Sequence, residues 1–131
     1  MASIRKELDI DVDVAKAWAL LRPVGDAHLA FKPVLSSARL DRDIRTATFV
    51  NGMVLHEQIL DVDDSHRRVA YAATDAPGLT YHHATMEVTE RGSDKCRFVW
   101  VTDFIPAEAT SALAPLIDAG ASAFKTNLEG R

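Results

Sequence analysis

The chain ends in a segment whose apolar residues repeat with the period of an α-helix. The residues of this stripe are Leu113, Leu116, Ile117, Ala121, Phe124 and Leu128. They predict an amphipathic helix of about 20 residues and ~30 Å, long enough to cross a whole domain of this size. Pro115 fits if the helix begins near Ser111 and the proline lies in or near its first turn; otherwise it predicts a kink.

Before this helix, short segments alternate apolar and polar residues, which is the pattern of half-buried strands. The first strand, at 4–12, places most of its apolar residues on one face. Asp13 is then a suitable N-cap for a short helix over 14–21, and a second helical turn is expected over 26–31. Six more strands are predicted at 34–40, 44–50, 53–62, 67–74, 81–90 and 95–105.

Turn-forming residues separate these strands. Asn51-Gly52 predicts a two-residue type I′ hairpin turn, in which both residues take a positive φ. Further turns or loops are expected at 63–66, 75–78 and 91–94. Because the connections are short, the sheet is predicted to be antiparallel.

One helix ~10 Å wide cannot cover seven strands spaced ~4.8 Å apart. We therefore expect an α+β fold in which a curved seven-stranded antiparallel sheet surrounds the long C-terminal helix, with two short helices after the first strand and a cavity between helix and sheet. Small residues at positions expected to face inward either leave volume unfilled or let the two layers approach closely. They are Ala38, Ala47, Ala73, Gly120 and Ala121.

Composition sets limits on partners and location. The 131 residues fit one domain, 1–131. Fifteen Lys and Arg against nineteen Asp and Glu give a formal charge of −4, without the basic excess of a nucleic-acid-binding surface. Cys96 is the single cysteine, so an internal disulfide is excluded. Without a long apolar run or a signal pattern, we expect a cytoplasmic protein that does not insert into membranes, of unknown oligomeric state.

Glu57 is the first candidate site residue. It lies between Leu55 and Ile59 on one face of its strand, so its carboxylate points inward if those two face the helix. The opposite register would place Val54 and Leu60 inside and Glu57 in solvent.

Arg45 shares its face with Ala47 and Phe49, on the strand before that of Glu57. From there it could reach Glu57 across the hairpin. Pairing is the condition under which either charge could be buried, and a solvated Arg45 is the alternative.

Aromatic residues could form the walls of the cavity, although plain core packing is the alternative for each of them. Phe98 and Trp100 lie on one face of the last strand. The candidate ligand-binding residues are Arg45, Tyr71, Tyr81, Phe98, Trp100, Thr102 and Phe124.

His82 and His83 are adjacent on a strand, so they point to opposite faces and cannot bind one metal together. Tyr81 and His83 share a face, whereas Ala84 and its alternate neighbours suggest that the even positions face inward. We favour an inward His83, which requires a bulge and would supply an acid or base for ring closure or dehydration. HExxH, GxSxG, GxGxxG and P-loop motifs are missing from the sequence, so no metal or cofactor is expected.

The order of strand, two short helices, six strands and long helix resembles the START-like helix-grip superfamily, which includes the birch pollen allergen, plant abscisic acid receptors and polyketide cyclase/dehydrase families. The matching segments are DVDVAKAWALL, Arg45 followed by NGMVLHEQILDVDDSHRRVAY, TYHHATMEV and FVWVTDFIP. The glycine that often precedes the family's arginine is missing, since Arg42, Asp43 and Ile44 precede Arg45. The resemblance implies that Glu57 lines the cavity, where it could hold a ligand hydroxyl or a water.

The leading hypothesis is the binding of a small apolar molecule, such as a lipid, polyketide or aromatic metabolite, whose polar end Glu57 and Arg45 orient. The first alternative is a cofactor-free polyketide cyclase/dehydrase-like enzyme in which His83 or Glu57 moves protons. The second is a protein-interaction module with an incidental cavity.

Overall fold

The computed structural model describes residues 1–130, and Arg131, the last residue of the predicted domain, lies outside the described residues. Within that range seven strands form one antiparallel sheet in the order β1-β7-β6-β5-β4-β3-β2. The strands are β1 (Ala2–Ile10), β2 (Leu35–Asp41), β3 (Ile44–Phe49), β4 (Val54–Asp63), β5 (Arg68–Ala73), β6 (Tyr81–Glu90) and β7 (Cys96–Ile105). The α+β class and the helix-grip arrangement predicted from the sequence are confirmed.

Within residues 1–130, three α-helices and two 3₁₀ turns complete the fold. They are α1 (Val14–Leu21), η1 (Val24–Asp26), α2 (Ala27–Phe31), η2 (Ala107–Ala109) and α3 (Thr110–Glu129). Asp13 caps α1 as predicted, because its carboxylate accepts the Lys16 N–H at 2.9 Å. Pro115 is the sixth residue of α3, just beyond its first turn. None of the helices in the described chain is long and apolar enough to cross a membrane.

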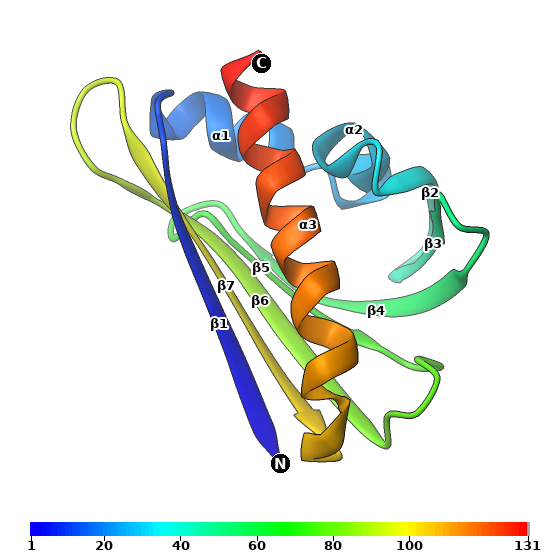
Figure 1. The fold of residues 1–131 in the computed structure, drawn as a ribbon. Helices are drawn as coiled ribbons and strands as arrows, with labels where there is room; N and C mark the ends of the chain where they lie inside the picture. Colours follow the sequence, from blue (N-terminus) through cyan, green and yellow to red (C-terminus); the bar gives the residue numbers. More distant parts are fainter. Residues whose placement is uncertain (131) are drawn as a thin grey trace.

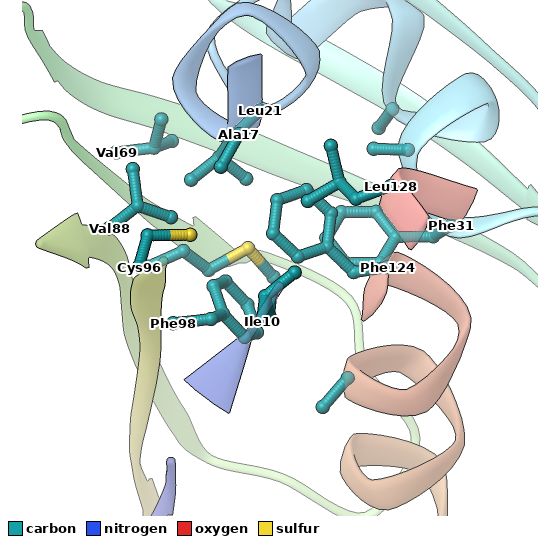
Figure 2. Close-up of a cluster of buried hydrophobic side chains, with 14 of the residues drawn as sticks. Ile10, Ala17, Leu21, Phe31, Val69, Val88, Cys96, Phe98, Phe124 and Leu128 are labelled. Carbon is teal, nitrogen blue, oxygen red and sulfur yellow. The ribbon is translucent and has the colours of Figure 1, made fainter. Parts of the chain in front are cut away.

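The sheet curves around α3, which runs along its concave face, and α1 and α2 pack at the end where the chain terminates (Figure 1). The core lies at that same end (Figure 2). Phe124 on α3 stacks on Phe31 of α2 and packs at a tilt against Phe98 of β7, with ring centroids 5.6 and 4.7 Å apart. The other end of α3 is less buried, since Leu113 is half-buried and Leu116 is exposed. The buried residues of this helix therefore begin at Ile117, and its first two turns are less enclosed.

The turn at Asn51-Gly52 differs from the prediction. Gly52 has φ +92°, but Asn51 does not have a positive φ, so a type I′ turn is excluded. The Gly52 N–H donates to the Phe49 carbonyl at 2.9 Å, and Phe49 pairs directly with Met53 through a 2.8 Å bond. Because β3 ends at Phe49, the loop contains three residues instead of two, and only its last residue needs a positive φ.

The turn before Arg45 takes the conformation that a glycine would favour. Asp41 pairs with Ile44 across a two-residue turn, and Arg42 in that turn has φ +58°. The chain thus enters β3 through a left-handed residue although the glycine of the family pattern is missing.

We expect Phe124→Ala to lower the free energy of unfolding by about 3–5 kcal/mol, because it removes the ring packed between α2 and β7. Leu116→Ala, on the exposed end of the same helix, serves as the control and is expected to cost less than about 1 kcal/mol. Urea denaturation followed by circular dichroism measures both. Equal losses would contradict the assignment of the core to one half of α3.

Candidate functional site

A cavity of about 270 Å³ lies beneath the N-terminal half of α3. Its walls are mostly apolar and come from β3 to β7, from α2, from the loop after β5 and from α3. Representative lining residues are Phe31, Ala47, Leu55, Met86, Leu113 and Ile117. An engineered cavity of ~150 Å³ with apolar walls takes up benzene, so the space here is large enough for a small organic molecule.

Small residues contribute to this space in two ways. Ala47 and Ala73 line the cavity, as does Gly120, whereas Ala121 lies in the core. A Cβ atom added at Gly120 would lie 2.9 Å from Cζ3 of Trp100. Gly120 therefore lets the indole ring of Trp100 lie directly against α3. The small residues thus both leave volume unfilled, at Ala47 and Ala73, and allow the two layers to approach closely, at Gly120.

Arg45 and Glu57 form a buried ion pair at the cavity wall. They are direct partners in the β3–β4 ladder, and Arg45 Nε donates to Glu57 Oε1 at 2.9 Å. Their side chains are only 8% and 11% exposed. Arg45 also donates through Nη1 to the Val24 carbonyl at 3.2 Å and lies 5.0 Å above the centre of the Tyr71 ring. The positive charge thus contacts a carboxylate, a carbonyl and an aromatic face.

A bulge in β4 shifts the side chains after it to the opposite face of the strand, so Glu57 and Val62 both face inward. Val54 and Leu60 are exposed, so the register that would place Glu57 in solvent is wrong. The β4–β5 pairing shifts between Ile59 and Asp61, which leaves Leu60 as the extra residue. Beyond that bulge Val62 packs against the core, although it belongs to the opposite phase.

Tyr71, Trp100 and Thr102 also line the cavity. Burial, together with the nearby negative charge of Glu57, raises the pKa of the Tyr71 phenol well above its ordinary value. Tyr71 is therefore a neutral hydroxyl at any physiological pH. The ring of Trp100 lies 6.0 Å from that of Phe31, measured between centroids.

Three of the candidate aromatic residues lie elsewhere. Phe98 and Phe124 are fully buried in the core and do not line the cavity. Phe124 lies on the C-terminal half of α3, and Phe98 on β7 packs against it. Tyr81 is 45% exposed on the outer face of β6. The structure therefore does not bring these three to the cavity with Arg45, Glu57 and Trp100.

The prediction that His83 points inward is wrong. β6 pairs with β7 without a bulge from Tyr81 to Glu90, so the even positions, including Ala84, face inward throughout. His83 lies on the outer face, with its Nδ1 4.0 Å from Asp103 Oδ2.

His82 is the histidine that lines the cavity. Its Nδ1 accepts the Ala73 N–H at 2.9 Å, and burial lowers its pKa below the ordinary value. The ring is therefore neutral near pH 7 and carries its proton on Nε2. The signal that could have identified His82 is the even phase of the apolar residues in its own strand.

Among residues 1–130, no group of three or more His, Cys, Asp or Glu side chains is placed to hold a metal ion. Cys96 is buried, and burial raises the pKa of its thiol to about 11. It therefore stays protonated and packs as a small apolar residue.

The family model described as polyketide cyclase/dehydrase and lipid transport matches residues 1–129. A comparison with curated protein sequences finds no match. Solved structures share the fold. A protein from Bacillus thuringiensis has a TM-score of 0.88 and 20% identity, over 97% of this chain and 98% of that one.

Two further solved structures also share the fold. A START superfamily protein from Mycobacterium smegmatis has a TM-score of 0.80 and 11% identity, over 98% of this chain and 97% of that one. Norcoclaurine synthase from Thalictrum flavum, in complex with dopamine and hydroxybenzaldehyde, has a TM-score of 0.75 and 22% identity, over 99% and 87%. At these identities the likeness shows a common fold.

We expect Arg45→Met and Glu57→Leu each to cost about 3–5 kcal/mol of stability, because each leaves one buried charge without its partner. The double variant is expected to cost less than either single variant, since it leaves no charge behind. Urea denaturation of all four proteins gives the coupling energy. Glu7→Gln, which breaks the exposed Arg5–Glu7 pair, serves as the control and should leave the midpoint nearly unchanged. Additive losses at Arg45 and Glu57 would contradict the pairing.

We expect His82 to make the protein less stable in mild acid. Its lowered pKa means that the unfolded chain binds the proton more readily, so its contribution is complete above about pH 6.5 and is lost as pH falls toward the folded-state pKa. The pKa values of Asp63 and Asp75 are lowered from 3.8, so their contributions are lost only in stronger acid.

Urea midpoints at about pH 7 and about pH 5 measure this effect. His82→Gln should show a smaller difference between the two than the unchanged protein. His83→Gln, on the neighbouring residue of the outer face, is the matched control. If His83→Gln flattened the pH dependence instead, the assignment to His82 would be refuted.

Proposed function

The chain belongs to the polyketide cyclase/dehydrase and lipid transport family, and on that premise we propose that it binds a small hydrophobic molecule in the cavity between the sheet and α3. The observation that carries this proposal is the cavity itself: about 270 Å³ of mostly apolar space with a few polar groups gathered at one part of its wall. Such a combination is typical of sites for small organic ligands.

The size of the cavity favours a compact molecule. If ~150 Å³ suffices for benzene, the space here suits one or two rings better than a long acyl chain. The complex of norcoclaurine synthase with dopamine and hydroxybenzaldehyde supports an aromatic ligand, since those molecules have a single ring and that protein shares the fold.

Binding explains the polar groups better than proton transfer does. Of the two residues predicted to move protons, His83 lies outside the cavity, and Glu57 is held by Arg45. In our proposal, Arg45 and Glu57 instead form a fixed polar wall that orients the ligand. The cytoplasmic location expected from the sequence stays a prediction.

Native mass spectrometry of the freshly purified protein tests for a bound molecule directly. A noncovalent excess over the denatured mass would support the proposal and allow the ligand to be identified.

A matched pair of variants then places the site. Ala73 lines the cavity, whereas the adjacent Ala72 points to the other face of β5. Ala73→Leu should weaken binding of 2-naphthol at least about tenfold, because the larger side chain overlaps the ligand. Ala72→Leu should leave the affinity nearly unchanged. Fluorescence titration measures both, and equal affinities for the two variants would refute binding in this cavity.

A further inference from the structure

We propose that the ligand presents a neutral oxygen acceptor, such as a carbonyl, to the indole N–H of Trp100, and that the cavity discriminates against a carboxylate in that place. This inference rests on the proposed function, because it specifies the ligand of the same cavity. It specifies the polar group of the ligand and the residue that recognises that group.

Trp100 supplies a buried donor that has no hydrogen-bond partner of good geometry in the described part of the protein. Among residues 1–130, Nε1 of Trp100 is enclosed without a hydrogen-bond partner. An indole N–H can only donate, and leaving a buried donor unpaired is unfavourable. A weak interaction of this N–H with the Tyr71 oxygen counteracts part of the rise in the phenol pKa, but it does not have the geometry of a hydrogen bond. Both residues line the cavity. A ligand oxygen that enters beside Tyr71 would satisfy this donor.

The indole is held in place before any ligand arrives. Gly120 lets its six-membered ring touch α3, and Phe31 and Phe98 flank it with ring centroids 6.0 and 6.2 Å away. Because the ring cannot easily turn, the direction of its N–H bond is fixed. The donor therefore selects ligands by the position of their acceptor.

The remaining polar groups argue for a neutral partner. Arg45 is already paired with Glu57 at 2.9 Å and bonded to the Val24 carbonyl, so its charge is compensated within the protein. A carboxylate entering beside them would lose its hydration and meet the Glu57 carboxylate without a free cation to pair with. His82 is neutral, because its Nδ1 accepts the Ala73 N–H, and its other ring nitrogen is a second donor on the wall.

The protein contains two tryptophans, and the second is a built-in control. Trp18 donates its indole N–H to Asp64 Oδ1 at 2.9 Å, outside the cavity. In ¹⁵N-labelled protein each indole gives one resonance, and Trp100→Phe assigns them. A ligand acceptor at the proposed position should move the Trp100 indole proton downfield and leave that of Trp18 unchanged.

Three planar probes of nearly the same shape separate the possibilities. Acetophenone carries a neutral carbonyl, α-methylstyrene replaces that oxygen by a methylene group, and benzoate carries an anionic carboxylate. We expect acetophenone, and not α-methylstyrene, to move the Trp100 indole proton downfield. Trp100→Phe should weaken the binding of acetophenone about three- to tenfold and change the affinity for α-methylstyrene less than about twofold. Benzoate should bind at least about tenfold more weakly than acetophenone.

The outcomes distinguish this inference from the proposed function. If α-methylstyrene binds and acetophenone leaves the Trp100 indole proton in place, the cavity binds ligands but the inference is overturned. Benzoate binding as tightly as acetophenone would overturn it as well. If none of the probes shifts any cavity resonance, the proposed function fails and this inference fails with it. Should Trp100→Phe not fold, Trp18→Phe assigns the two resonances instead, and the indole shifts of the unchanged protein still decide the question.

Discussion

One helix has to cover a sheet of seven strands, and the aromatic contacts of Phe124 determine which part of the sheet it covers. Phe124 packs against Phe98 and Phe31, so the C-terminal half of α3 is fixed to β7 and α2. The far half of the helix faces the part of the sheet that curves away toward β2, β3 and β4 (Figure 1). The cavity lies there. Core and cavity thus have one cause, the area mismatch between a single helix and a wide curved sheet.

The buried ion pair and the cavity occupy the same place, and neither is explained by stability alone. Apolar residues of similar volume commonly replace a buried ion pair without loss of stability, and an unfilled cavity forgoes packing contacts. Since native proteins are stable by only about 5–15 kcal/mol, such features weigh heavily in a chain of this length. The proposed function gives Arg45 and Glu57, which lie beside an apolar space, a role that folding alone does not supply.

Local patterns predict the order of the elements, and their bounds to within about two residues, because alternation, capping and turn residues act over a few positions. The predicted strand at 81–90 matches β6 throughout. Side-chain destinations were less predictable. Phe98 and Trp100 share one face of β7, two residues apart, yet the first is core and the second lines the cavity. That difference depends on which residue of α3 lies opposite each ring, Phe124 or Gly120, and no local pattern records it. For His82, the even phase of the apolar residues in β6 is the correct local signal. An inward His83 would require a bulge, and β6 pairs with β7 without one.

The polar wall of the cavity is neutral although the chain carries a formal charge of −4. Surface charge therefore says little about a ligand enclosed here, because the two buried charges compensate each other at 2.9 Å and solvent is kept from them. Tyr71 stays protonated and His82 stays neutral near pH 7, for the same reason of burial. Under the proposed function, the shape of the cavity and the direction of a few fixed donors select the ligand. Gly120 would contribute indirectly, because the lack of a side chain there sets the position of the Trp100 ring.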